Sequence, residues 1–329
     1  MDPRIPTPNT WSATDVITQI AIPTPVTSTS QQSAITNAFS IDLEDYFHTE
    51  VACKVVHQGA WDAMPSCIER STMELLDILD RTNTRATIFV LGWVARKQPN
   101  LVRHIQDRGH EVACHSDRHR RVHTLTPAEF FEDTRVAREA IQDAGGKVIR
   151  GYRAPSFSIT EGTEWAFEIL ADLGFTYDSS VYPVYHPTYG NPKAMRFPYY
   201  VADCRLLEIP VATWRVCSIN LPVGGGAYLR VLPELYIRAG LRAINEIDRE
   251  PAMLYVHPWE IDPIQPRLKL NTTSQLRQTI GLNTMAAKLE RLLVAQPFAP
   301  IEQVYAHLIP QWHTALVQAS PFEAVEVHA

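Results

Sequence analysis

The chain has 329 residues, 45% of them hydrophobic, and a formal net charge of −6. This length and apolar content suit one large or two ordinary domains with a buried core. Acidic residues outnumber basic ones and Lys and Arg form no run, so the composition argues against a nucleic-acid partner. The five cysteines have no Cys-x-x-Cys spacing, which predicts reduced thiols and a cytoplasmic protein.

The N-terminal segment, residues 1–37, is rich in Pro, Thr, Ser and Gln. It has neither the basic start nor the apolar run of a signal peptide, so we expect a disordered leader. No window of the chain approaches the roughly 18 to 20 apolar residues that a membrane span requires. We therefore expect no membrane span.

From Ala38 onward, strand-like and helix-like segments alternate, which is typical of parallel strands connected by covering helices. Pro99 and Gly109 are placed to begin and end one helix, and Thr126-Pro127-Ala128-Glu129 is a capping box that begins another. The expected strands are 38–43, 86–91, 111–114, 148–152, 175–177, 206–211 and 252–256. The expected helices are 67–79, 99–109, 127–145, 162–173 and 284–294.

Polar side chains with catalytic potential follow five of the expected strands. They lie in the stretches Ser40–Asp45, His115–His119, Arg153–Pro155, Asp178–Ser180 and Val256–Trp259. The carboxyl ends of strands in such β/α folds face one common crevice. Two histidines four residues apart and a distant group of carboxylates supply the three protein ligands of a catalytic divalent metal. The pattern predicts metal-assisted hydrolysis.

The same stretches resemble, in order, the motifs of the polysaccharide deacetylase family, also called the NodB-homology or carbohydrate esterase family 4. The similar segments are Ser40–Phe47, His115–His119, Gly151–Phe157, Asp178–Pro183 and Tyr255–Asp262. The branch associated with exopolysaccharide loci, which has a C-terminal extension, resembles the chain most. The resemblance implies an α/β fold, a distorted and incomplete β/α barrel. Its limits would be 38–263 for the catalytic domain, 264–313 for the extension packed on the barrel and 314–329 for a tail.

The activity implied by this resemblance is removal of N-acetyl groups from an N-acetylated polysaccharide or its precursor. Water bound to a divalent metal, with Zn²⁺ preferred, would attack the acetamide. His115 and His119 would be metal ligands, Asp42 the general base and His257 the general acid.

Two further residues would assist the acid and the base. Arg153 resembles the family arginine that pairs with the base, and Asp178 resembles the carboxylate that orients the acid histidine. The third metal ligand is open between two residues. Strand alternation favours Glu44, whereas a turn at Leu43 would bring Asp45 instead.

Four residues are candidates for substrate contact: Tyr46, Pro155, Tyr228 and Trp259. Tyr46 and Trp259 are equally typical of core packing, because aromatic rings bury a large apolar surface. The glycines 224–226 predict a flexible loop beside the cleft.

The alternative function is that of an allantoinase-like or cyclic-imide amidohydrolase, since the same scaffold serves such enzymes. The presence of both histidines and of His257 favours the deacetylase. An iron-dependent oxygenase site of two histidines and one carboxylate is disfavoured, because such sites usually lie on antiparallel jelly rolls.

Overall fold

The fold is taken from a computed structural model, which describes residues 34–145, 147–186, 189–203 and 205–310. The expected tail, 314–329, and most of the expected leader lie outside these ranges. Asn37, the last residue of that leader segment, is the fully buried first residue of strand β1.

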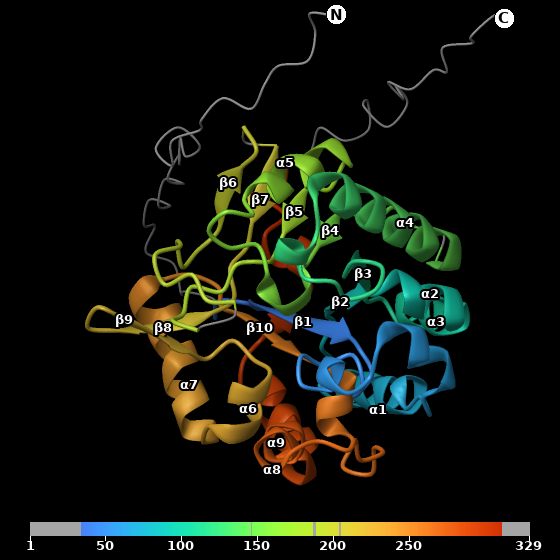
Figure 1. The fold of residues 1–329 in the computed structure, drawn as a ribbon. Coiled ribbons are helices and arrows are strands. Elements are labelled where there is room, and N and C mark those ends of the chain that lie inside the picture. The colour runs from blue at the N-terminus through green and yellow to red at the C-terminus, as the bar shows by residue number, and fades with distance from the viewer. Residues whose placement is uncertain (1–33, 146, 187–188, 204, 311–329) are drawn as a thin grey trace, which may run out of the picture.

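In the described part of the chain, nine strands form one curled sheet (Figure 1). They are β1 (Asn37–Leu43), β2 (Thr87–Val90), β3 (Glu111–Cys114), β4 (Gly151–Tyr152), β5 (Tyr177–Asp178), β6 (Tyr199–Val201), β7 (Leu206–Glu208), β10 (Met253–Val256) and β11 (Phe298–Ala299). The strand order is β10-β1-β2-β3-β4-β5-β7-β6, and β11 also pairs with β1. All pairings are parallel except that of β6 with β7. Because β10 and β6 lie at opposite ends of this order, the sheet is an incomplete barrel, as predicted.

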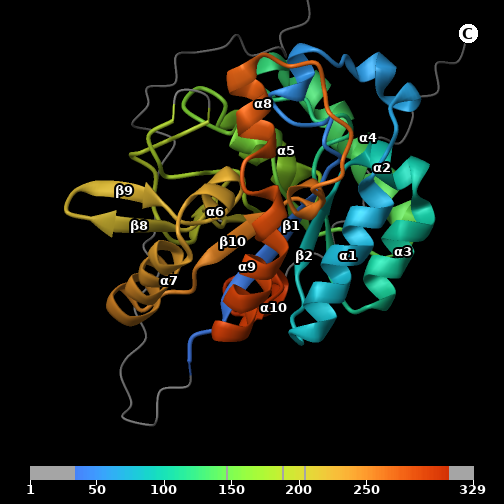
Figure 2. The ribbon, with the colours of Figure 1, turned by 90° about the horizontal axis from the view of Figure 1, so that it is seen from below.

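Helices cover the outside of the sheet. They are α1 (Ile68–Arg81), α2 (Gly92–Lys97), α3 (Pro99–Asp107), α4 (Pro127–Gly145), α5 (Trp165–Asp172), α6 (Ala227–Val231), α7 (Glu234–Ala243), α8 (Thr272–Thr279), α9 (Leu282–Ala295) and α10 (Ile301–Val304). In Figure 2, α1 and α9 lie along β1 and β2. Strands β1, β2, β3 and β10 are buried along their whole length, which is typical of a parallel sheet covered by helices.

Several helix ends follow the local sequence. Thr126 and Glu129 form the expected capping box: the backbone N–H of Thr126 donates to the Glu129 carboxylate at 2.8 Å, and that of Glu129 donates to the Thr126 hydroxyl at 3.3 Å. Proline begins α3 and α4, where its missing N–H removes no helical hydrogen bond.

The hairpin of β8 (Thr213–Val216) and β9 (Ile219–Pro222) was not predicted from the sequence. Its turn has no glycine or asparagine to mark it, and Cys217 adopts the positive φ of 54°. The glycines 224–226 are not a flexible loop, since Tyr255 in β10 donates to the Gly224 carbonyl at 2.7 Å. A Cβ on Gly225 would lie 2.0 Å from the Tyr255 carbonyl oxygen, so glycine permits this close approach.

The C-terminal extension adds a strand to the sheet. Asn37 and Ala38 of β1 pair with Phe298 and Ala299 of β11. Helix α9 packs Met285 and other apolar side chains into the core. Among the described residues, none of the helices has both the length and the apolar content needed to cross a bilayer.

Candidate metal centre and active site

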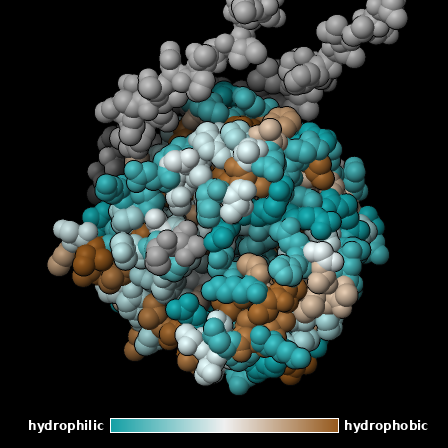
Figure 3. Space-filling model, in the orientation of Figure 1, coloured by the Kyte–Doolittle hydropathy of each residue, from teal (hydrophilic) through white to brown (hydrophobic). Residues whose placement is uncertain are grey.

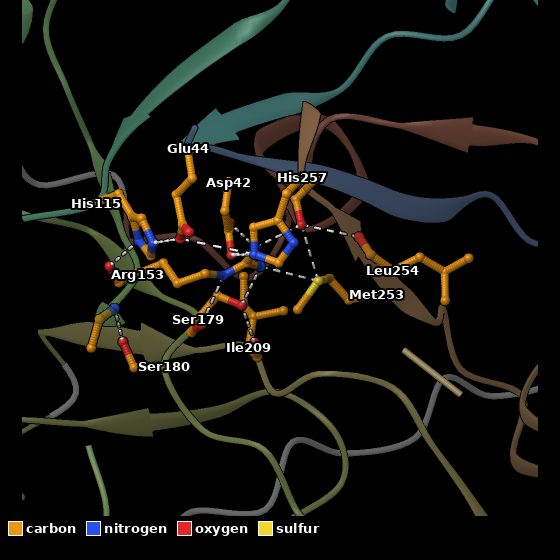
Figure 4. Close-up of polar contacts among 12 residues, drawn as sticks. Asp42, Glu44, His115, Arg153, Ser179, Ser180, Ile209, Met253, Leu254 and His257 are labelled. Carbon is orange, nitrogen blue, oxygen red and sulfur yellow. Dashed lines mark hydrogen bonds and ion pairs between the residues drawn. The ribbon is translucent and has the colours of Figure 1, made fainter. Parts of the chain in front are cut away.

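The strand ends bring the predicted catalytic side chains into one buried group (Figure 4). Asp42 lies near the end of β1, and Glu44 follows that strand directly. His115, Arg153 and His257 are each the first residue after β3, β4 and β10. Parallel pairing therefore gathers residues that are far apart in sequence.

Glu44, His115 and His119 have the spacing of a metal-ligand set. The Glu44 Oε1 atom lies 3.0 Å from His115 Nε2 and 2.9 Å from His119 Nε2. Burial alone would raise the pKa of the Glu44 carboxyl, but the neighbouring His119 and His257 and the hydrogen bond with His119 lower it well below its usual value. Glu44 is therefore a carboxylate that faces two imidazoles.

The hydrogen bonds of His115 fit a metal ligand. Its Nδ1 lies 2.9 Å from the backbone carbonyl oxygen of Arg153, which only accepts, so Nδ1 carries the proton. In the neutral ring, Nε2 then carries a lone pair that faces a Glu44 oxygen. A cation between these two atoms would accept electron pairs from both. One carboxylate and two imidazoles form a donor set suited to Zn²⁺, and the carbonyl behind His115 is the outer partner that fixes such a ligand.

A tight loop, not a helix, carries His119. Ser116 and His119 have positive φ angles of 64° and 54°, and the His119 N–H donates to the Ser116 hydroxyl at 3.0 Å. These left-handed residues turn the chain so that both histidines face Glu44. Such conformations cost free energy in non-glycine residues and often mark functional loops.

Asp45 does not reach this group. The chain turns at Leu43, where the Glu44 N–H donates to the Asp42 carbonyl at 2.9 Å, yet the turn presents Glu44 to the histidines. Asp45 Oδ2 instead accepts hydrogen bonds at the start of α1, from the Ser66 hydroxyl at 2.7 Å and the Cys67 N–H at 2.9 Å.

Arg153 and Asp42 form a buried ion pair. Arg153 Nη1 lies 2.6 Å from Asp42 Oδ1, and the arginine is fully buried. Its remaining N–H groups donate to the carbonyl and hydroxyl oxygens of Ser179 and to the Ser40 hydroxyl, and its guanidinium lies 4.1 Å from the centre of the Phe89 ring. A planar cation held on all sides fixes the Asp42 carboxylate in one orientation.

His257 faces the same centre from β10. Its Nε2 lies 3.8 Å from Glu44 Oε1 and 3.9 Å from Asp42 Oδ2. On the other side of the ring, Nδ1 lies 3.1 Å from Glu260 Oε2, and Glu260 Oε1 pairs with Arg230 at 2.8 Å. Burial lowers the pKa of His257, but the carboxylates of Glu44, Glu260 and Asp42 outweigh it and raise the pKa to about 9.

Asp178 is not the partner of His257 that the sequence predicted. Its Oδ1 accepts from the Ser180 hydroxyl at 2.6 Å, and its carboxyl forms a hydrogen bond with Glu208 on the next strand. Burial raises the pKa of Asp178 to about 6 and that of Glu208 well above its usual value. Asp178 occupies a structural acid pair below the site because β5 directs it toward β7.

Sequence reasoning missed Glu260 as the partner of the acid histidine. The spacing was visible: His257 and Glu260 are three residues apart in a capping box, and the His257 N–H also donates to Glu260 Oε2 at 3.0 Å. Arg230, which the sequence placed after a glycine loop, is 6% exposed and anchors Glu260 from α6.

Two of the four substrate candidates belong to the core. Tyr46 is 1% exposed, packs against Phe47 and donates to the Pro65 carbonyl at 3.1 Å. Trp259 is 5% exposed and its ring stacks on His257, with centroids 5.5 Å apart. Both rings therefore support neighbouring residues and present no open surface to a sugar.

The other two candidates differ from each other in exposure. Pro155 is buried at the start of a short 3-10 turn that follows Arg153. Tyr228 is half-buried in α6, where its ring meets Tyr182 edge-on and its hydroxyl bonds with Tyr189.

Comparison with protein-family models divides the chain in two. Residues 51–177 match the model described as polysaccharide deacetylase, and residues 179–306 match a model described as a domain of unknown function (DUF3473). The boundary falls between β5 and the last part of the same sheet, so the second match contains β7, β10 and His257.

Two solved structures share the fold. A candidate polysaccharide deacetylase from Mycobacterium smegmatis aligns with a TM-score of 0.56 at 20% identity, over 93% of this chain and 99% of that one. A second candidate, from Pseudomonas aeruginosa PAO1, aligns with a TM-score of 0.54 at 16% identity, over 88% of this chain and 93% of that one. The fold is therefore that of the NodB-type deacetylases.

Curated relatives match a shorter part of the chain. A chitooligosaccharide deacetylase of Bradyrhizobium sp. (strain ANU 289) is 36% identical over 101 residues, which cover 30% of this chain and 43% of the relative. A peptidoglycan-N-acetylglucosamine deacetylase of Bacillus cereus is 31% identical over 98 residues, 30% of this chain and 36% of the relative. The matched part is thus less than half of either relative. The family model and these relatives show that part of the chain is similar to polysaccharide deacetylases, and the shared fold extends that similarity to the architecture of the sheet.

Proposed function

We propose that this chain is a metal-dependent hydrolase that removes N-acetyl groups from an N-acetylated oligo- or polysaccharide or its precursor. The observation that carries the proposal is the contact of Glu44 Oε1 with both histidine Nε2 atoms, flanked by Asp42 and His257. We propose Zn²⁺ as the metal, because a carboxylate and two imidazoles leave an open position for water in a tetrahedral site.

Glu44, His115 and His119 would hold a divalent cation, which would supply a Lewis acid and lower the pKa of water. Asp42, held in place by Arg153, accepts a proton from water as the C–O bond to the acetyl carbon forms. His257 donates a proton to the nitrogen as the C–N bond breaks. The products are acetate and the free amino sugar.

The ion pairs behind the two proton-transfer groups support opposite roles for them. The Asp42 carboxylate is paired with a guanidinium that holds it in one orientation, so it acts as the base. His257 faces carboxylates that raise its pKa to about 9, so it holds a proton at neutral pH and acts as the acid. Glu260 is a positioning residue: it accepts from Nδ1 and leaves Nε2 directed at the site.

The substrate class follows from the relatives, which act on chitooligosaccharide and on N-acetylglucosamine of peptidoglycan according to their names. We also propose the exopolysaccharide branch, in which the extension 264–313 belongs to the functional unit. A cytoplasmic location is supported by the free thiols of Cys53, Cys67, Cys114 and Cys217. Immunodetection in fractionated cells tests the location, and recovery outside the cytoplasm would contradict it.

The activity is tested with purified chain and N-acetylglucosamine oligomers, by measuring acetate before and after a chelator and after Zn²⁺ is returned. We expect release that the chelator abolishes and Zn²⁺ restores. Chelator-insensitive or absent release, together with opening of the allantoin ring, would replace the deacetylase by a cyclic-amide hydrolase.

A further inference from the structure

The segment around α8 has a charge opposite to that of the whole chain. From Pro263 to Leu289 the sequence contains no Asp or Glu, although the chain carries a net charge of −6. Arg267, Lys269 and Arg277 lie exposed in this segment, and none of them forms an ion pair with a described acidic side chain. We call these three residues the basic strip.

Apolar side chains are exposed among these cations. Ile264, Leu276 and Ile280 are 72%, 59% and 37% exposed. Figure 3 shows apolar side chains gathered below the central hollow of the molecule, in the region where Figure 1 places α8 and α9. Cations and large apolar side chains that alternate on one exposed segment are typical of surfaces that bind at a membrane interface.

Hydrogen bonds from two buried side chains fix this segment to the rest of the chain. Gln265 donates to the carbonyls of Trp259 and Asp262, each at 2.9 Å, and Gln278 donates to the Tyr46 carbonyl at 3.0 Å. The exposed side chains therefore lie on a fixed surface, and binding them does not require the segment to fold first.

The same segment contacts the residues behind the acid histidine. Arg230, which pairs with Glu260, also donates to the carbonyl oxygens of Ile280 at 2.7 Å and Arg277 at 3.2 Å. Gln278 bonds with the loop that follows Glu44. Residues 277–280, which include Arg277 of the basic strip, therefore lie next to the residues behind His257.

From these contacts we infer that the face formed by the basic strip, Ile264, Leu276 and Ile280 docks on an anionic lipid membrane. The cations lie near the lipid phosphates and the three apolar side chains enter the headgroup region. Docking there holds the candidate active site near the membrane surface, where a membrane-bound glycan is presented.

Other occupants fit this face less well. In a symmetric contact with a second copy, the same cations would face each other without acidic partners. A soluble anionic polysaccharide would match the cations, but it offers no apolar surface for Ile264 or Leu276. The combination of charge and exposed apolar area favours a lipid surface.

The test is sedimentation of the full chain with vesicles of phosphatidylcholine alone or mixed equally with phosphatidylglycerol. We expect binding to the mixed vesicles only, weakened by salt. Each Lys or Arg near an anionic surface strengthens binding about fivefold, so reversing Arg267, Lys269 and Arg277 to Glu should weaken it at least about a hundredfold. The double variant Ile264→Ser, Leu276→Ser should also bind more weakly, with its charge unchanged.

A matched control reverses three exposed cations elsewhere, Lys147, Arg215 and Arg242, to Glu. The inference would be overturned if both triple variants lost vesicle binding equally, if the wild-type chain bound both kinds of vesicle equally, or if it did not sediment with vesicles at all. Binding of soluble polygalacturonate to the basic strip, without binding of vesicles, would also overturn it. Circular dichroism and acetate release from soluble oligomers check each variant. Unchanged release with lost vesicle binding separates this inference from the proposed activity.

Discussion

Glu260 accepts two hydrogen bonds from His257, one from its backbone N–H at 3.0 Å and one from its ring Nδ1 at 3.1 Å. The carboxylate thereby fixes both the start of the 3-10 turn and the orientation of the imidazole. Arg230 holds the second carboxylate oxygen at 2.8 Å. Glu260 therefore makes the contact with His257 that was expected of Asp178.

Glu260→Gln should lower kcat on the order of a hundredfold with little change in KM, because an amide that keeps its contact with Arg230 turns an N–H toward the Nδ1 of His257. Asp178→Asn should change kcat only a few-fold, since it alters a pair with Glu208 away from the reacting atoms. Steady-state kinetics on acetylated oligomers distinguishes them. A large kcat loss in Asp178→Asn with none in Glu260→Gln would restore the original assignment.

Adjacent carboxylates at the end of β1 should respond differently to substitution. Glu44→Ala should weaken Zn²⁺ binding at least about a hundredfold, since it removes a direct ligand where even outer-shell changes cost about 10 to 100-fold. Asp45→Ala should keep Zn²⁺ affinity and lose about 2 kcal/mol of unfolding free energy, because it leaves the start of α1 without its acceptor. Calorimetric titration with Zn²⁺ and urea unfolding measure the two effects. Normal Zn²⁺ affinity in Glu44→Ala would disprove the ligand set.

The buried pair of Arg153 and Asp42 should behave as a unit. Arg153→Met should cost about 3 to 5 kcal/mol, because the Asp42 carboxylate then remains buried without a counter-charge. The double variant Arg153→Met, Asp42→Asn should recover much of this stability but no activity. A double-mutant cycle from urea unfolding measures the coupling, and strictly additive losses would argue against the pair.

Glu111 should make stability depend on pH. Burial and the nearby Glu302 raise its pKa in the folded chain to about 7, from an ordinary value of 4.5. The folded state therefore holds the proton more tightly, and stability falls as pH rises from about 4.5 through about 7, by on the order of 3 kcal/mol.

Glu111→Gln imitates the protonated carboxyl, so this variant should not lose stability as the pH rises. Its carbonyl and amide replace a carboxyl that accepts hydrogen bonds from Tyr177 and from the Glu302 N–H. Urea unfolding at pH 5 and pH 8 compares the two proteins. If the wild-type chain and the variant show the same pH dependence, another group is responsible.

The sequence by itself determined the strands and the polar residues at their carboxyl ends. Apolar runs and helix-end residues are local, so they indicated β1, β3 and β10 and placed Asp42, His115 and His257 at those ends. The types of those residues were sufficient to predict a metal site, because imidazole and carboxylate are the ligands such chemistry needs.

Only the tertiary structure decided which partner each carboxylate contacts. Glu44 reaches the histidines while Asp45 is bound at the start of α1, and Asp178 is withdrawn because β7 places Glu208 beside it. Each outcome depends on contacts between segments that are distant in sequence. Residue periodicity predicts which face of a strand a side chain lies on, but it does not predict which residue of the neighbouring strand that side chain contacts. Glu260 lies close to His257 in sequence, yet only the structure showed its contacts with the His257 ring and with Arg230 on α6.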